Sequence, residues 1–479
     1  MAYYGTLVIG GVVVLSNPDA GMDQLIEQAC QTEAKVLITL QNFGRLAQEL
    51  TAQSKVKEIV TIEFDSQVPE TVIDHLAMSF RAAEPALDKS VDSNNGVDET
   101  EISRTTTNVD IVGVTLADLV SSAPITRPNV DVSPDSLAAI LYTSGTTSEP
   151  KGVSLSHCNL VANAIQTRHW VPDLEYGKET FLSVVPLLHS YGMTAAMNLP
   201  IVAGASMVLM PMFEPKQVLE QIKRYRPTIF MAVPAMYGAL IRVPDARSYG
   251  LSSIKACLSG SAPLPVEIQE AFEKLTHGRL VEGYGLTEAS PVTHANPLYG
   301  RRKAGSIGVP LPNTDARIVS LSGGEDLPPG EIGRLYVRGP QIMQGYYREP
   351  SEFRALLPDG WLDTGDVALM DGDGYFHIIG RTRDVIRAGE HTVYPRDVEE
   401  LLYENNKVGE AVVVGVPAES DDQKVKAFVV PRDGSNLTSE ELLDLCRRRL
   451  EAYAVPAEIE FRQELPKTFS GKVIRRLLA

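Results

Sequence analysis

Short apolar runs alternate with segments of helical periodicity along most of this sequence. This alternation restricts the possible folds more than any other feature of the sequence. The spacing of apolar residues predicts helices over residues 21–31 and 46–52. Apolar runs predict strands over residues 137–142, 181–185 and 206–209. Because strands that alternate with helices are typical of layered α/β proteins, we expect an α/β fold with sheets and helices in layers.

The chain has 479 residues, more than one hydrophobic core usually organises, so two or more domains are expected. Pro328, Pro329 and Gly330 break one segment, and a run with a different charge balance begins at Arg381. We place the main boundary there. Residues 1–380 would form a large N-terminal part of several subdomains, and residues 381–479 a small α+β domain. Residues 81–108 are acidic and rich in Ser, Thr, Asn and Asp, which predicts a loop.

The net charge of −17 argues against a nucleic-acid surface, because binding to a phosphate backbone needs a basic footprint. From Arg381 onward the chain carries 16 of its 44 Lys and Arg residues and 18 of its 61 Asp and Glu residues. The negative charge therefore lies almost wholly before Arg381, and a polyanionic ligand would meet less repulsion after it.

Neither a membrane span nor a disulfide framework is expected. The apolar stretch 7–15 is too short to cross a bilayer and lacks the basic start of a signal peptide, so we interpret it as a core element. The four cysteines are scattered and suggest neither disulfides nor zinc. We expect a cytoplasmic protein with small-molecule substrates. Peripheral membrane contact and oligomer formation both stay open.

The loop YTSGTTSEPKG, residues 142–152, follows one of the predicted strands directly. Small hydroxyl residues and glycine allow N–H and O–H groups to converge on phosphate oxygens, and Lys151 adds a compensating charge. The loop is not a Walker A motif, because Pro150 stands in place of the glycine before the lysine and Gly152 in place of the Ser or Thr after it. Taken alone, the loop is also compatible with a flexible Ser/Thr turn.

Further motifs follow in a fixed order: YGLTE at 284–288, WLDTGD at 361–366, GRTRD at 380–384 and PKTFSGK at 466–472. In isolation, Asp366 would be a turn residue beside Gly365, and Lys472 a surface lysine. Together with the loop at 142–152, the set resembles the adenylate-forming superfamily of acyl-CoA synthetases, luciferases and peptide-synthetase adenylation domains. The resemblance covers nearly the whole chain and implies that a carboxylic acid attacks the α-phosphorus of ATP to form an acyl-adenylate and pyrophosphate.

The resemblance assigns roles to individual residues. It implies that Thr287 approaches the α-phosphate, Tyr284 stacks on adenine, and Asp366, assisted by Arg381, binds the ribose hydroxyls. Thr143 and Glu288 would hold Mg²⁺, and Lys472 would contact both the acid and the α-phosphate. Thr287, Glu288, Arg381 and Lys472 are thus the candidate catalytic residues. The remaining candidate nucleotide-binding residues are Ser144, Gly145, Thr146, Thr147, Lys151, Ser261, Ala262, Pro263, Gly283, Gly285 and Ile378.

Members of this superfamily rotate their small C-terminal domain between adenylation and thioester formation, so residues 381–479 are expected to be mobile, with the hinge at Arg383. The text between the motifs is most similar to bacterial long-chain fatty-acid CoA ligases. The implied substrates are a fatty acid, ATP and CoA. His189, Tyr191 and Met193 are candidate substrate contacts, although a core position for His189 explains that histidine equally well.

Two departures from the family pattern affect this interpretation. Glu390 stands where the family generally carries the glycine that lines the CoA passage, and Gly389 precedes it. A glutamate adds bulk and negative charge there, which favours the alternative of an adenylate-only enzyme with another acceptor. Family members usually have several tens of residues, with strands and helices, before the segment that stands near the start of this chain. Without those strands, exposed sheet edges are expected. A degenerate protein that binds nucleotide or acyl chain without turnover is the third alternative.

Overall fold

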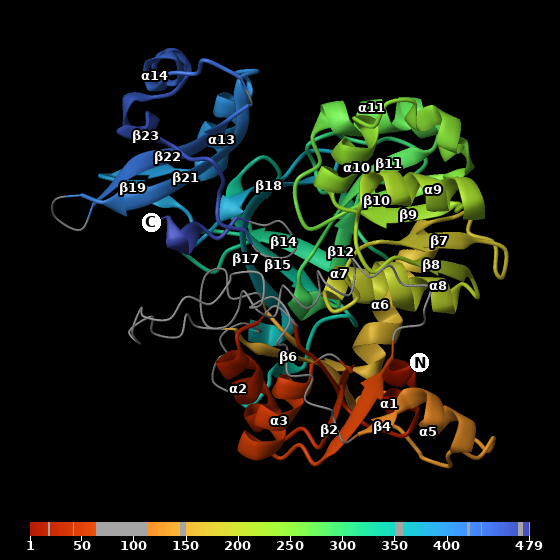
Figure 1. Ribbon diagram of the computed structural model, residues 1–479. Helices are drawn as coiled ribbons and strands as arrows, with labels where there is room; N and C mark the ends of the chain where they lie inside the picture. The colour runs from red at the N-terminus through yellow and green to blue at the C-terminus, as the bar shows by residue number, and fades with distance from the viewer. Residues whose placement is uncertain are drawn as a thin grey trace, which may run out of the picture. The chain divides into compact units, whose positions relative to one another are not determined.

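The computed structural model divides into two compact units, Met1–Ile140 and Leu141–Ala479. It describes residues 1–17, 20–41, 43–63, 113–143, 150–349, 358–418, 422–432, 434–467 and 473–478. Both units combine helices with strands (Figure 1), which confirms the α/β class with several sheets. The boundary predicted near Arg381 lies within the second unit and stays a prediction. The loop predicted at 81–108 lies outside the described residues.

The first unit contains a small parallel sheet with the order β2-β3-β4. Helices α2 (Met22–Thr32) and α3 (Gly44–Gln53) confirm the helices predicted at 21–31 and 46–52. Their apolar faces bury Leu25, Leu46 and Leu50 in one core cluster. The other elements are α1 (Ala2–Val8), β1 (Val13–Leu15), β2 (Val36–Leu40), β3 (Glu58–Ile62), β4 (Val114–Thr115) and α5 (Leu116–Ser122).

The prediction of a core element at residues 7–15 is wrong. Gly10 has a φ of 75°, and with Gly11 it separates the end of α1 from β1. The apolar residues around this break are exposed, with Val8 at 45% and Ile9 at 56%. Apolar composition alone predicted burial there, but the two glycines prevent a single continuous element.

A seven-stranded sheet forms the centre of the second unit. Its neighbouring strands β8, β7, β9, β10 and β11 run parallel, and β12 and β13 continue the sheet in antiparallel pairing. The strands in spatial order are β13 (Val309–Pro310), β12 (Val292–Ala295), β11 (Arg279–Gly285), β10 (Ala256–Ser259), β9 (Ile229–Ala232), β7 (Thr180–Ser183) and β8 (Ser206–Leu209). β8 has the bounds predicted for the strand at 206–209, and β7 overlaps the strand predicted at 181–185.

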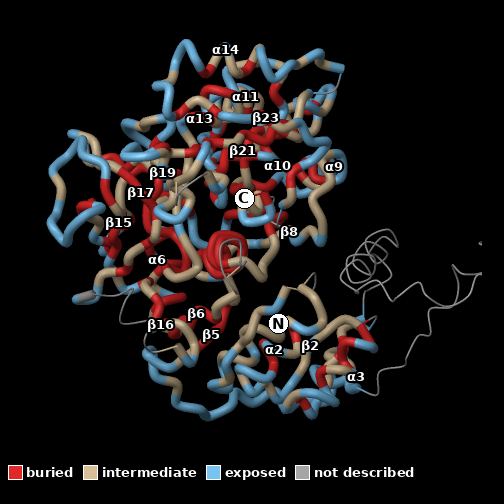
Figure 2. The backbone as a smooth tube through the Cα atoms, turned by 90° about the vertical axis from the view of Figure 1, so that its left-hand side faces the viewer, coloured by how far each residue is buried: buried red, intermediate tan, exposed pale blue. Residues whose placement is uncertain are grey.

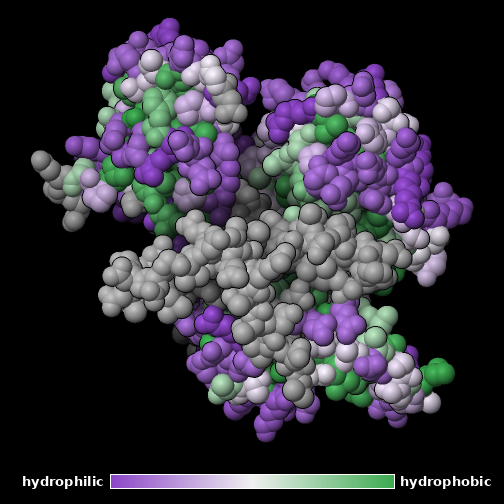
Figure 3. All heavy atoms as spheres, viewed as in Figure 1, coloured by the Kyte–Doolittle hydropathy of each residue, from purple (hydrophilic) through white to green (hydrophobic). Residues whose placement is uncertain are grey.

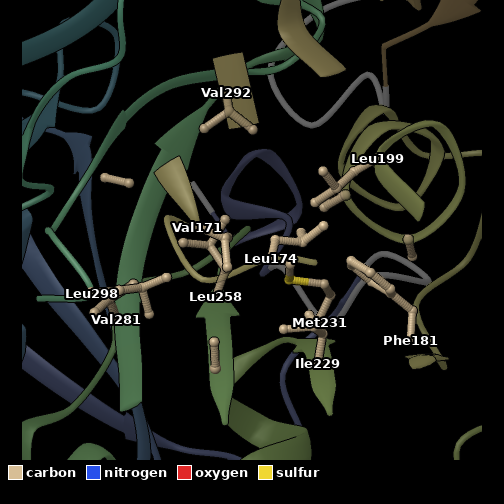
Figure 4. Close-up of a cluster of buried hydrophobic side chains, with 14 of the residues drawn as sticks. Val171, Leu174, Phe181, Leu199, Ile229, Met231, Leu258, Val281, Val292 and Leu298 are labelled. Atoms are coloured by element: carbon tan, nitrogen blue, oxygen red, sulfur yellow. The ribbon is translucent and has the colours of Figure 1, made fainter. Parts of the chain in front are cut away.

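Each face of this sheet carries its own core, because successive side chains of a strand point to opposite faces. Ile229 and Met231 pack into one core, and Phe230 and Ala232 into the other. Figure 4 shows Met231 and Leu258 beside Val171 and Leu174 in the first core. Residues of α7 (Ser190–Met193) and α8 (Leu199–Val202) complete the first core, and those of α9 (Pro215–Tyr225), α10 (Pro234–Ile241) and α11 (Val266–Thr276) the second.

A four-stranded antiparallel sheet follows in the chain, with the order β14-β15-β17-β18. Its strands are β14 (Asp315–Val319), β15 (Ile332–Arg338), β17 (Leu362–Met370) and β18 (Phe376–Arg381). The register places Asp366 of β17 opposite Arg381 of β18. A shorter pair joins β6 (Gly152–Ser156) to β16 (Gly345–Tyr346). β5 (Leu137–Tyr142) confirms the strand predicted before the Gly/Thr/Ser loop, and α6 (His157–Trp170) follows β6.

The last hundred residues contain a core of their own, built from residues between Ile386 and Ile459. Buried residues (red in Figure 2) concentrate in strands such as β21, whereas α14 is largely exposed. Figure 3 shows hydrophilic side chains over the outer surfaces of α9, α11 and α14. The elements are β19 (Ile386–Ala388), β20 (His391–Val393), α13 (Pro395–Tyr403), β21 (Val408–Pro417), β22 (Gln423–Pro431), α14 (Ser439–Arg449) and β23 (Glu458–Phe461).

Candidate active site

Two groups of predicted nucleotide residues lie at the carboxyl ends of β10 and β11, a position where ligands bind in open parallel sheets. Ser261, with a φ of 68°, and the exposed Ala262 and Pro263 come directly after β10. At the end of β11, a Cβ on Gly285 would lie 2.1 Å from the carbonyl oxygen of Pro291, so the turn requires glycine. A Cβ on Gly283 would lie 3.2 Å from the Leu258 side chain.

Three residues predicted from separate motifs meet at one carboxylate. Asp366, 4% exposed, accepts a short hydrogen bond from the Tyr284 hydroxyl through Oδ2. Its Oδ1 lies 3.0 Å from Nε of Arg381. Each carboxylate oxygen offers more than one lone pair, so Asp366 keeps acceptor capacity for a pair of hydroxyl groups.

The charges at this contact follow from its surroundings. The negative charge of Asp366 raises the pKa of Arg381, so the guanidinium remains cationic. Burial, and then the charge of Asp366, raise the pKa of Tyr284 well above its ordinary value, so the phenol remains a neutral donor. The contact therefore presents a carboxylate held between a fixed cation and a neutral aromatic ring.

Thr143 and Lys151 close the base of the predicted phosphate loop. The Thr143 N–H donates to the Lys151 carbonyl at 2.9 Å, and the Lys151 N–H donates to Oγ1 of Thr143 at 3.0 Å. The Lys151 ammonium lies 5.1 Å from the ring centroid of Tyr346 and 3.9 Å from Oε2 of Glu349. The loop residues between them, Ser144, Gly145, Thr146 and Thr147, lie outside the described residues.

The YGLTE motif continues from β11 into the short helix η4 (Thr287–Ala289). Oγ1 of Thr287 lies 3.4 Å from the hydroxyl oxygen of Ser190. Oε1 of Glu288 accepts a 3.0 Å hydrogen bond from the Tyr346 hydroxyl. Tyr346 thus contacts both Lys151 and Glu288, which belong to motifs far apart in the sequence.

The three candidate substrate residues lie at or next to α7. His189 precedes the helix, and burial lowers its pKa. Tyr191 is only 8% exposed, and its hydroxyl donates to the Leu258 carbonyl at 2.5 Å, so its polar end is already engaged within the core. Met193 is fully buried. Tyr191 and Met193 are therefore parts of the core in this structure, and a role in substrate binding stays a prediction for them.

The other predicted site residues lie in β18 or between β18 and the end of the chain. The Ile378 carbonyl accepts a 2.5 Å hydrogen bond from Arg396 of α13, and Arg383 is exposed. Gly389, with a φ of 63°, and Glu390 form a two-residue turn, because Ala388 pairs with His391. Such hairpin turns favour glycine at the first position, which explains Gly389. Lys472 lies outside the described residues.

Sequence reasoning missed Tyr346. It lies between YGLTE at 284–288 and WLDTGD at 361–366 and belongs to none of the motifs that carried the resemblance. The only local signal is an aromatic pair, Tyr346 and Tyr347, after Gly345. Such a pair is equally typical of an ordinary sheet edge.

His294 makes the stability of this region depend on pH. It lies opposite Tyr284 in the β11–β12 register and is fully buried, and burial lowers its pKa to about 3 from an ordinary 6.5. Between pH 3 and pH 6.5, the His294 imidazole is therefore protonated in the unfolded chain but neutral in the folded chain. The contribution of His294 to stability is complete above pH 6.5 and is lost as the pH falls toward 3; at pH 5 the loss is about 2 kcal/mol.

We expect His294→Gln to reduce the loss of unfolding free energy between pH 7.5 and pH 5 by about 2 kcal/mol, measured by urea denaturation. Comparison with the parent chain is necessary because Glu282, whose pKa burial raises to about 7, changes stability in the opposite direction. His169→Gln, at an exposed position of α6, is the matched control. An equal pH dependence in all three proteins would contradict the assignment.

Family models and individual relatives both match this chain over most of its length. The AMP-binding enzyme family matches residues 1–347, and the AMP-binding enzyme C-terminal domain matches residues 397–472. A long-chain-fatty-acid–CoA ligase of Bacillus subtilis (strain 168) is 43% identical over 478 residues, which cover 100% of this chain and 82% of the relative.

Two solved structures show the same fold over nearly the whole chain. Anthranilate CoA ligase AuaEII, in complex with anthranoyl-AMP, is 26% identical with a TM-score of 0.81, covering 100% of this chain and 84% of that one. The amide bond synthetase McbA from Marinactinospora thermotolerans is 27% identical with a TM-score of 0.80, covering 99% and 86%. Among the described residues, no helix is both long and apolar enough to cross a membrane.

Proposed function

Because the chain belongs to the AMP-binding enzyme family, we propose that it activates a long-chain fatty acid with ATP and transfers the acyl group to CoA. The fatty acid carboxylate attacks the α-phosphorus of ATP, giving acyl-AMP and pyrophosphate. The CoA thiol then attacks the acyl carbonyl, giving acyl-CoA and AMP. The observation that carries the proposal is the direct contact of Tyr284, Asp366 and Arg381, which come from three separate motifs of the sequence.

The proposed nucleotide contacts follow from the geometry of this carboxylate. Asp366 accepts the ribose hydroxyls, and Arg381 keeps the carboxylate oriented at 3.0 Å. The ring of Tyr284 offers a face for adenine, and Ser261, Ala262 and Pro263 form the opposite wall. Lys151 and Thr287 lie toward the phosphates, and Lys472 contributes the charge at the α-phosphate during adenylation.

Thr143 and Glu288 would hold Mg²⁺, and their donor set fits this ion. Both supply oxygen atoms, and Mg²⁺ in nucleotide sites is usually held by one or two carboxylates together with phosphate oxygens. When bound, the ion neutralises negative charge on the phosphates. The Tyr346 hydroxyl fixes Oε1 of Glu288 at 3.0 Å, so the carboxylate has a defined position.

Residues 381–479 are proposed to act as a separate domain that moves about Arg383. Their core uses only residues after the hinge, and Arg383 is exposed between β18 and β19, which suits a segment that changes its backbone angles. Movement of this domain would bring Lys472 to the site for the first step, and the turn with Gly389 and Glu390 for the second.

Hydroxylamine trapping tests the proposed reaction. With a long-chain fatty acid such as palmitate, ATP and Mg²⁺, we expect the fatty hydroxamate to form without CoA, and acyl-CoA to form when CoA is added. The second candidate function, adenylation with a non-CoA acceptor, is favoured by Glu390 and would give hydroxamate but no thioester. Nucleotide binding without either product would indicate a degenerate binding protein. Repeating pyrophosphate exchange with acids of different chain length defines the preferred substrate.

A further inference from the structure

One side chain outside the recognised motifs, Tyr346, joins two charged residues of the nucleotide site. Its hydroxyl donates to Oε1 of Glu288 at 3.0 Å, and the Lys151 ammonium lies 5.1 Å from the centroid of its ring. A phenol bonded to a carboxylate and a cation placed on an aromatic ring are each favourable, and a tyrosine side chain has few rotatable bonds. One rigid side chain therefore links the two charged residues.

The backbone around Tyr346 is fixed on both sides. The Met343 N–H donates to the Glu288 carbonyl at 2.8 Å, which ties the approach to β16 directly to the YGLTE motif. Tyr346 pairs with Val153 of β6, and the Tyr347 N–H donates to the Gly152 carbonyl at 2.7 Å. β16 thus connects the strand that leaves the phosphate loop with the helix that carries Glu288.

We propose that Tyr346 is a positioning residue of the nucleotide site, whose hydroxyl orients Glu288 toward the divalent cation and whose ring locates Lys151. This inference rests on the proposed function, because it assumes that Glu288 faces a metal–nucleotide complex. Loss of the hydroxyl leaves the ring beside Lys151 but allows the carboxylate to rotate. Loss of the whole ring also removes the aromatic contact of the lysine, which then keeps Glu349 at 3.9 Å as a charged neighbour.

The chain offers a closely matched control in Tyr336. Its hydroxyl donates to Oδ2 of Asp363 at 3.0 Å, and the Arg334 guanidinium lies 5.4 Å from its ring centroid. This reproduces the phenol–carboxylate–cation arrangement within the β14-β15-β17-β18 sheet, outside the proposed nucleotide site. Tyr336→Phe therefore measures the effect of losing the same phenol–carboxylate hydrogen bond at a place where neither nucleotide nor metal is expected to bind.

The test measures Mn²⁺ binding by electron paramagnetic resonance in the presence of a non-hydrolysable ATP analogue. We expect Tyr346→Phe to weaken Mn²⁺ binding about tenfold, the typical effect of losing a hydrogen bond to a charged group. Analogue binding in EDTA and the KM for the fatty acid should change less than about twofold. Tyr346→Leu should additionally weaken analogue binding in EDTA, and Tyr336→Phe should leave Mn²⁺ binding unchanged.

A double-variant comparison separates orientation of Glu288 from a general structural effect. In the background of Glu288→Gln, Tyr346→Phe should cause no further loss of Mn²⁺ binding, because the oriented carboxylate is already absent. Additive losses, or equal Mn²⁺ binding by Tyr346→Phe and the parent chain, would overturn the inference while leaving adenylation intact. If the parent chain neither binds the analogue nor catalyses pyrophosphate exchange, the proposed function itself fails.

Discussion

Replacing Asp366 with asparagine is expected to slow acyl-adenylate formation at least about a hundredfold. The carboxylate is 4% exposed, whereas the side chain of its partner Arg381 is 37% exposed, so neutralisation of Asp366 leaves a partly solvated cation without its partner. Losing a hydrogen bond to a charged group typically costs about 1.5–3 kcal/mol, and each 1.4 kcal/mol corresponds to a factor of ten. The acceptor for the ribose hydroxyls is weakened by the same change. Pyrophosphate exchange with saturating fatty acid measures the effect.

Asp363→Asn is the matched control, because Asp363 lies on the same strand and makes a similar pair. Its Oδ2 lies 3.0 Å from Nη1 of Arg334 and accepts from Tyr336. We expect both variants to lower the melting temperature, but only Asp366→Asn to raise the KM for ATP. Equal exchange rates in the two variants would show that Asp366 contributes only to folding.

Replacing Glu390 with glycine is expected to accelerate the transfer step about tenfold to a hundredfold and to leave adenylation unchanged. A charge that must lose water when the CoA arm approaches costs about 1–3 kcal/mol, and the glycine removes both that charge and its bulk. Both residues of the turn are exposed, and Gly389 already supplies the positive φ. The variant should therefore keep the hairpin. Single-turnover transfer from preformed acyl-AMP to CoA isolates this step.

Two further variants separate the causes. Glu390→Gln keeps the bulk and removes the charge, so a rate between those of the parent and the glycine variant would divide the effect between them. Glu451→Gln removes an exposed charge elsewhere in the C-terminal region and should leave transfer unchanged. If Glu390→Gly transfers no faster than the parent chain, this position does not limit access of CoA.

Local patterns in the sequence predicted several elements closely. The spacing of Thr438 and Glu441 is typical of a helix start, and α14 does begin at Ser439, where Oγ1 of Thr438 accepts from the Glu441 N–H at 3.3 Å as an N-cap. The carboxylate of Glu441 accepts from Lys407 instead of completing the capping box, at distances of 2.8 and 3.1 Å. The local sequence thus placed Glu441 at the start of a helix. Its hydrogen-bond partner, Lys407, comes from another part of the chain and follows only from the tertiary structure.

Apolar runs that alternate with helical segments predicted the α/β class. The loop at 142–152, in order with the later motifs, carried the resemblance to a family, and that resemblance implied the reaction. Which side chains of different motifs touch one another could not be predicted from the motifs themselves. Tyr284 and Asp366 are 82 residues apart, and Glu288 and Tyr346 are 58 apart. Whether such side chains meet depends on strand order and register, which no local pattern specifies. The sequence determined which groups the site contains, and only the tertiary structure decided that Tyr346 connects two of them.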